Sequence, residues 1–180
     1  MRTAVLVLAA SLCTAAAPAA GAPPPTPPTD VSPLTVMPAT APPKLTATYP
    51  AAGEAVTPGL LVLRLDFDQP MLKSGFDIAA APGGEAPECL ATPRLLDDGK
   101  RFALLCRIQP GRSYALAFNG AGKGGFANQG QVRAPAASLA FTTTGGGPVL
   151  YVKDALKAAG LGEADVPVQD SPKVPPAAPL

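Results

Sequence analysis

Two cysteines, Cys89 and Cys106, have the spacing in this sequence that most directly suggests a covalent bond. They flank the segment Asp97-Asp98-Gly99-Lys100, and an Asp-Gly pair between two strand-like runs predicts a β-hairpin. Ideal pairing about Asp98-Gly99 misses the two cysteines by two residues, so a two-residue offset or a bulge is needed. A redox-active pair is not favoured, because C-x-x-C spacing and a neighbouring His are both absent. The sequence predicts a structural disulfide, formed in an oxidising compartment.

Composition argues against several other kinds of chemistry. The 180 residues include no His, which excludes Ser-His and Cys-His nucleophile pairs and every metal site that uses His. Only four Glu are present, and no carboxylate pair sits in a framework typical of a glycosidase. A formal net charge of +1 gives no electrostatic footprint for nucleic acid. We expect a protein that is not an enzyme, holds no cofactor and binds no nucleic acid.

The densest carboxylates, Asp66, Asp68 and Asp77, are the candidates for calcium. Asp66 and Asp68 share the outer face of one predicted strand, so one ion could contact both. No acidic turn or loop completes a coordination shell around them. We therefore expect solvated surface charges and no metal site.

The segment 119–137 is long and rich in Gly, and it is the candidate binding loop. Binding residues often lie on loops that a rigid sandwich supports. Phe126 is either an exposed anchor for a partner or a side chain that packs over the end of the sandwich. The polar and charged residues that such a loop could present are Lys123, Asn128, Gln129, Gln131 and Arg133.

Period-two alternation between residues 44 and 144 predicts an all-β fold, an Ig-like β-sandwich of about seven antiparallel strands. In the segment 61–68, Leu61, Leu63, Leu65 and Phe67 share one parity, and a largely polar set shares the other. Seven short strands in about 100 residues have the size and rhythm of an Ig-like sandwich. The clear candidates are 61–68, 101–108, 114–119 and 139–141, and the weaker ones are 44–49, 75–80 and 89–96.

Residues 1–19 have the features of a signal peptide: Arg2, an apolar run over 4–12, and small residues up to a cut after Ala19. A lipid-modified Cys13 is not favoured, because the large Leu12 precedes it. No later stretch approaches twenty apolar residues, so we expect no transmembrane segment. The expected location is the periplasm or the extracellular space.

Both ends of the predicted domain are rich in Pro. Residues 20–43 are expected to form a disordered linker, and residues 145–180 a Gly/Pro-rich tail. A short helix is expected near 149–159, with Leu150, Val152, Leu156 and Ala159 roughly on one side and Gly160 as its stop. The helix either docks on the sandwich or stays loose, and we favour a weak attachment.

Several segments together resemble a known family. A P-x-x-G turn at Pro50 is followed by a strand that ends Phe67-Asp68-Gln69-Pro70-Met71. Segments 104–108, 110–114 and 139–143 then follow in order. Over residues 44–144 the chain resembles bacterial Ig-like domains of the S-layer protein type. It departs from them in 119–135, which lacks the Asp-x-x-Gly-Asn turn that relatives often carry, so an ion-binding or turn role of that Asp is in doubt.

The residues of these segments also have physical roles of their own. Phe67 should anchor its strand, and Pro70 should end it because proline donates no ladder hydrogen bond. Met71 should fill the crossing between the sheets. Tyr114 is placed as in a tyrosine corner, where its hydroxyl bonds to upstream backbone.

The function expected from these features is that of an exported, non-enzymatic Ig-like module of the bacterial cell envelope. Such a module would bind an envelope protein or glycan, which the sequence does not identify, or act as a structural spacer. The same P-x-x-G and F-x-x-P features also resemble periplasmic copper-resistance β-sandwich proteins, so the alternative is a small-ligand or metal carrier. Those proteins use His, whereas this chain offers only Met37, Met71 and acidic residues.

Overall fold

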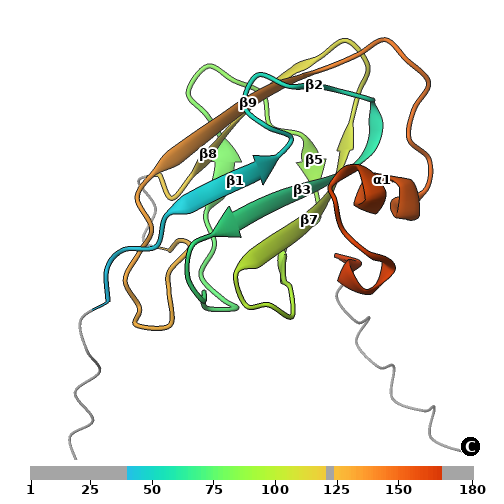
Figure 1. Cartoon of the computed structure of the whole chain (residues 1–180). Coiled ribbons are helices and arrows are strands. Elements are labelled where there is room, and N and C mark those ends of the chain that lie inside the picture. The colour runs from blue at the N-terminus through green and yellow to red at the C-terminus, as the bar shows by residue number, and fades with distance from the viewer. Residues whose placement is uncertain (1–39, 121–123, 168–180) are drawn as a thin grey trace, which may run out of the picture. The chain divides into compact units, whose positions relative to one another are not determined.

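The computed structural model describes residues 40–120 and 124–167, which form two β-sheets around a shared core (Figure 1). The first sheet has the order β1-β3-β7-β5, with β6 also paired to β7. Its strands are β1 (Leu45–Tyr49), β3 (Gly59–Phe67), β5 (Glu88–Cys89), β6 (Arg94–Leu95) and β7 (Arg101–Ile108). The second sheet has the order β2-β9-β8-β4, with β2 (Ala55–Val56), β4 (Ile78–Ala80), β8 (Ser113–Phe118) and β9 (Ala137–Thr143). The all-β sandwich is confirmed.

Some of the features expected from the sequence lie outside the described residues. These are the signal peptide with Cys13, the linker up to residue 39 with Met37, Lys123 in the candidate loop, and residues 168–180 of the tail.

The core follows from the alternation in the long strands. β3 and β7 pair antiparallel, with Leu63 opposite Leu104, and every second residue of a strand points to the same side. The inward-facing side chains of both sheets are almost fully buried. They include Leu61, Leu63, Leu65, Phe67, Phe102, Leu104, Cys106, Ile108, Tyr114, Leu116, Phe118, Leu139 and Phe141.

Two details of the strands differ from the expectation. The pair β2–β9 is parallel, with Ala55 opposite Thr142, and the sequence predicted neither β2 nor a parallel pair. A strand of two residues carries no detectable alternation, which explains the omission. The predicted strand 89–96 is interrupted at 90–93 and forms the separate strands β5 and β6.

The interruption at 90–93 also explains the spacing of the cysteines. β6 continues the ideal hairpin register on β7, with Leu95 opposite Phe102, whereas β5 is shifted so that Cys89 lies opposite Cys106. The two-residue offset required by the sequence is therefore placed between the two short strands. It brings the cysteines into register, and they form a disulfide.

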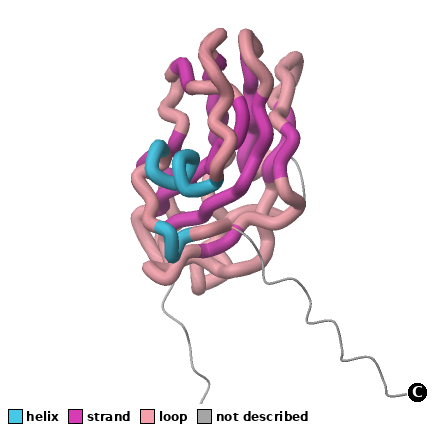
Figure 2. The backbone as a smooth tube through the Cα atoms, turned by 90° about the vertical axis from the view of Figure 1, so that its right-hand side faces the viewer, coloured by secondary structure: helices cyan, strands magenta, loops and turns pink. Residues whose placement is uncertain are grey.

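The helical segment is docked on the first sheet, which corrects the expectation of a weakly attached helix. Helix α1 (Val152–Ala158) and the 3₁₀ helix η1 (Glu163–Asp165) lie on one side of the strands (Figure 2). Leu156 and Ala159 pack on Val62 of β3 and Ala103 of β7, and both strand residues are fully buried. The second face of β3, expected to be largely polar, thus carries a second apolar cluster beneath the helix.

The end of α1 is fixed by its C-terminal cap. Gly160 has a positive φ of 67°, and the N–H groups of Gly160 and Leu161 donate to the carbonyls of Lys157 and Leu156. This pair of hydrogen bonds is the Schellman motif, and the Leu156–Leu161 side chains share one cluster, as that motif commonly has. Arg64 of β3 donates to the Ala159 carbonyl and ties the same helix end to the sheet.

Candidate functional site

Phe126 does not act as an exposed anchor. Its side chain is only 1% exposed, and its ring centroid lies 4.9 Å from that of Phe102 and 5.5 Å from that of Phe67. Phe126 is thus part of the central core between the sheets. The middle of the candidate binding loop is a structural plug and offers no aromatic contact to a partner.

Asn119, at the start of the loop, holds this plug in place. Its Oδ1 accepts a hydrogen bond from the Phe126 N–H at 2.7 Å, and its Nδ2 donates to the carbonyls of Phe126 and Ala134. Asn119 is 3% exposed and has a φ of 53°, a conformation that Asn tolerates better than most residues. No role of Asn119 was predicted from the sequence, because nothing in the neighbouring residues signals one.

Asn128 is also structural, although it was predicted as a binding residue. It is 1% exposed, and its Nδ2 donates to Thr40 Oγ1, the Ala41 carbonyl and Gln69 Oε1 at 3.0–3.1 Å. Its Oδ1 accepts from the Val132 N–H. Asn128 therefore ties the residues just before β1 to the loop, so residues 40–43 belong to the folded unit and not to the linker.

The remaining loop residues are divided between internal contacts and solvent. Arg133 donates to Asp77 Oδ2 at 3.4 Å and to the Gly120 carbonyl at 3.1 Å. Gln129 and Gln131 are exposed. Of the described residues predicted for binding, only these glutamines are exposed, and Gln129 lines a hollow of about 520 Å³ together with Lys73 and Asp97.

The carboxylates considered for calcium each have a partner within the chain. Asp66 pairs with Arg64 at 3.1 Å, Asp68 accepts from the Lys44 N–H at 2.9 Å, and Asp77 lies against Arg133. Within residues 40–120 and 124–167 there is no cluster of three or more metal-ligating side chains drawn from Cys, Asp and Glu. Met71, the soft ligand considered for copper, is 2% exposed in the central core.

The motif residues are placed in structural positions. β3 ends at Phe67, and Pro70 follows on the surface, after which Met71 enters the core. The Met71 N–H donates to the Gly99 carbonyl at 2.8 Å. The Tyr114 hydroxyl accepts from the Gln109 N–H at 2.9 Å, the upstream backbone contact expected of a tyrosine corner.

The hairpin turn beside the disulfide holds the clearest shift of an acidic pKa. Burial alone would raise the pKa of Asp98, but hydrogen bonds from the Lys100 N–H and from the Arg101 side chain and N–H outweigh it and lower that pKa. In turn, the hydrogen bond to Asp98 raises the pKa of Arg101. Burial, with the charge of Glu54 added, raises the pKa of Tyr49. None of these groups combines with a nucleophile or second acid in a cleft, so they stabilise local structure.

A mainly apolar hollow lies where β3 begins and β7 ends. We call it the outer groove, and its volume is about 500 Å³. One rim is the segment 146–150, which is joined to β3 by the hydrogen bond from the Leu60 N–H to the Val149 carbonyl at 2.8 Å. Its apolar lining consists of Pro58, Leu60, Ile108, Pro110, Pro148, Val149 and Leu150.

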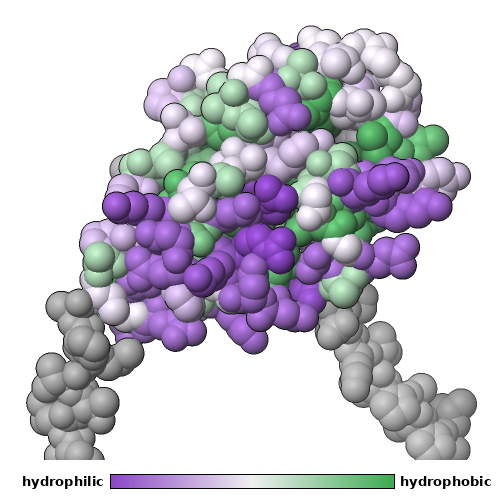
Figure 3. All heavy atoms as spheres, in the orientation of Figure 1, coloured by the Kyte–Doolittle hydropathy of each residue, from purple (hydrophilic) through white to green (hydrophobic). Residues whose placement is uncertain are grey.

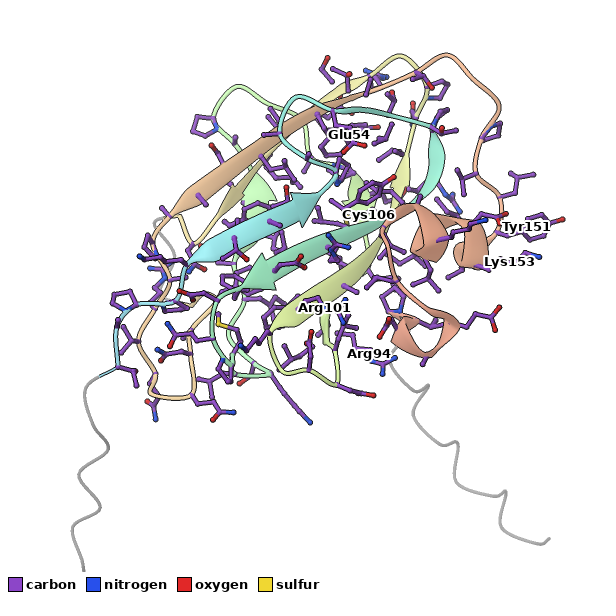
Figure 4. All side chains as sticks on the ribbon, viewed as in Figure 1. Glu54, Arg94, Arg101, Cys106, Tyr151 and Lys153 are labelled. Atoms are coloured by element: carbon purple, nitrogen blue, oxygen red, sulfur yellow. A yellow bond between two sulfur atoms is a disulfide. The ribbon has the colours of Figure 1, made fainter. Side chains whose placement is uncertain are left out.

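The outer groove was not predicted, because the sequence analysis assigned Leu150 to the buried side of the helix. The helix begins two residues later, and Leu150 is 68% exposed. Tyr151 is 64% exposed and points away from the domain beside Lys153, whose Nζ lies 5.6 Å from the ring centroid (Figure 4). Apolar surface is visible at this edge of the domain in Figure 3. One sequence feature could have indicated the groove: the run Pro148–Tyr151 is apolar but lacks the spacing of a helix face.

Comparisons with known proteins give little further information. Neither a family model nor a curated protein matches this sequence. Among solved structures, the S-layer protein rSbsC(31–844) is similar at 12% identity with a TM-score of 0.40. The alignment covers 61% of this chain and 14% of that one, so this chain spans a small part of the S-layer protein. In the part of the chain that the structure describes, no helix is long and apolar enough to cross a membrane.

Proposed function

We propose that this chain is an exported, non-enzymatic β-sandwich module that serves the cell envelope as a structural or interaction unit. The observation that carries the proposal is the Cys89–Cys106 disulfide. It fastens β5, an edge strand of two residues, to β7 in the middle of the first sheet. A staple of this kind persists in an oxidising compartment and is rare where thiols are kept reduced.

The rest of the chain supports this proposal. The N-terminal sequence has the order of charge, apolar run and small residues found in signal peptides. The chain has no His, and Asp66, Asp68 and Asp77 each have a partner within the chain, which supports a role outside acid–base and metal chemistry. The S-layer-type kinship rests on the sequence motifs of residues 44–144.

Export and disulfide formation are tested together by fractionating a bacterial host that expresses the full chain. Thiols are labelled with a maleimide polymer before and after reduction. We expect a shortened chain outside the cytoplasm that is labelled only after reduction. A matched control, Leu8→Arg, interrupts the apolar run and should keep the chain unprocessed and its thiols free. Unprocessed wild-type chain with free thiols would overturn the proposal.

An interaction role is distinguished from a spacer role by affinity capture from an envelope extract. Deleting the loop 119–137 is not a suitable control, because the deletion removes Phe126 from the core. Protein that has been reduced and alkylated, and that circular dichroism shows to be unfolded, provides the comparison instead. A partner retained by the oxidised module and lost on its unfolding supports interaction, whereas clean failure by folded protein supports a spacer.

A second candidate function is carriage of a small ligand. The observation that favours it is a cavity of about 370 Å³ between the edges of the two sheets, lined by Leu104 and Leu116 of the core, by Pro87 and Leu90, and by the carboxylate residue Asp77. Pockets that hold small ligands have about this size. Saturable binding of a fluorescent fatty acid, lost in Ala86→Trp at the pocket mouth, would support it. No saturable binding by the oxidised protein would remove it.

A further inference from the structure

The outer face of the first sheet is only partly covered. Strand pairing places Leu60 opposite Arg107 and Ala103 opposite Arg64, so these residues share the outer face. Helix α1 covers the part around Val62 and Ala103. The part toward β5 and the outer groove has no cover among the described residues.

The exposed large apolar side chains of the described residues gather on this part of the molecule. They are Leu90, which is 47% exposed, Leu150 and Tyr151. Leu90 lines a smaller hollow over β5 and β7, and this hollow shares Leu60 and Arg107 with the outer groove. The two hollows therefore adjoin, and we call the apolar surface formed by Leu90, Leu105, Leu60 and the lining of the outer groove the apolar track. Apolar surface gathered in one track is typical of a docking site.

The chemistry of the track fits an extended, proline-rich segment. Its walls are proline rings and aliphatic side chains. Polyproline conformations have no internal hydrogen bonds, so their carbonyls are free to accept from donors such as Arg107. Grooves of this kind recognise proline-rich chains at a low cost in conformational entropy.

The chain itself carries such a segment, and it begins close to the track. Residues 168–180 include four prolines and directly follow Pro167. The described chain is held there by Arg94, whose Nη1 donates to the Val166 carbonyl at 2.9 Å. Arg94 lies opposite Ala103 of β7, on the outer face.

The segment is long enough to reach the outer groove. From Ala103 to Arg107 the strand advances four residues, about 13 Å. A polyproline segment advances 3.1 Å per residue, so thirteen residues span about 40 Å. Position 172 follows Pro167 by five residues, an extended reach of about 16 Å, which exceeds the about 13 Å from Ala103 to Arg107.

We propose that residues 168–180 dock in cis on the apolar track, with the Pro172–Pro176 part in the outer groove. The docked segment covers Leu90 and Leu150, and any partner that uses this face must first displace it. This inference goes beyond the proposed function and does not depend on export.

The test places a photo-reactive benzoylphenylalanine at position 174 of the full, oxidised chain. Cross-linked peptides are identified by mass spectrometry in a mixture of light and heavy isotope-labelled protein. We expect cross-links within one chain to residues 58–60, 107–110 or 146–150. In Leu150→Asp these should fall by about tenfold, because burial of one leucine contributes at least that preference.

A matched control is Ala79→Asp, an exposed position on β4 of the other sheet, which should leave the cross-links unchanged. Thermal unfolding shows whether each variant is folded. Mixed light–heavy cross-links would mean that a second copy occupies the groove, and this would overturn docking in cis. Cross-links elsewhere, or an equal yield in folded Leu150→Asp, would overturn the proposal as well.

Discussion

Replacing Phe126 with Ala should destabilise the whole domain and not merely alter its surface. The side chain is 1% exposed and packs on Phe67 and Phe102 with ring distances of 5.5 and 4.9 Å. Removal of a fully buried Phe side chain costs about 3–5 kcal/mol. The free energy of unfolding of a small domain is only about 5–15 kcal/mol, so this change removes a large part of the stability.

The expected loss is large enough to measure without ambiguity. At about 4 °C per kcal/mol, the midpoint of thermal unfolding should fall by about 12–20 °C. Circular dichroism of the oxidised protein follows the transition. Gln129→Ala, an exposed change on the same loop, is the matched control and should stay within about 0.5 kcal/mol of wild type.

A small effect of Phe126→Ala on stability would contradict the burial of this side chain. If Phe126→Ala shifted the midpoint by less than about 4 °C, the ring would not be contributing a core contact of the expected size. Combined with loss of partner capture, that outcome would make Phe126 an exposed anchor after all. It would refute the assignment of the loop as a plug.

Three further predictions concern the disulfide, Gly59 and the hairpin turn at Asp98. Reduction of the disulfide, which closes a separation of 17 residues, should lower the free energy of unfolding by about 3 kcal/mol in urea titrations with and without reductant. Gly59→Ala should cost about 1–3 kcal/mol more than Gly53→Ala in the same assay. Both glycines have positive φ, but only at Gly59 would the new Cβ overlap the Val149 carbonyl. Asp98→Asn should be less stable than wild type at pH 7, and the difference should shrink as the pH falls below about 4, because the depressed pKa of Asp98 stabilises the fold only while its carboxylate is ionised.

The central strands were predictable because their buried side chains alternate over many residues. Only one strand register buries Leu61, Leu63 and Leu65 of β3 on the same side. The apolar residues that β7 places opposite them face the same core. The disulfide was predictable because the Asp-Gly turn placed Cys89 within two residues of the required position. The offset was absorbed at 90–93, where no strand pattern constrains the chain.

Docking of the helix was the less favoured alternative, although the sequence held a signal for it. Val62, Ala103 and Leu105 fall on the side of β3 and β7 that was assigned to solvent, and all three are apolar. A sheet face with such residues needs cover, and a short amphipathic segment with a Gly stop followed downstream. Taken together, the two patterns predict docking, whereas each taken alone predicts a loose tail.

The loop could not be assigned from sequence for a different reason. Irregular segments carry no period, so nothing local distinguishes a buried Phe126 from an exposed one. Asn119 and Asn128 are equally hard to assign, because a polar residue is predicted to be exposed to solvent unless its hydrogen-bond partners are known. Their partners are backbone groups of the loop itself and residues 40–41, which only the folded chain brings together.

The first sheet, and not the loop 119–137, offers the better candidate for a binding surface. A binding surface needs large side chains that remain exposed in the folded domain. The large apolar side chain of the loop, Phe126, is buried in the core. Leu90, Leu150 and Tyr151 remain exposed although the neighbouring helix shows that this face can be covered. Whatever the module holds, its contacts are therefore expected along β5 and the outer groove, where covering apolar surface still gains free energy.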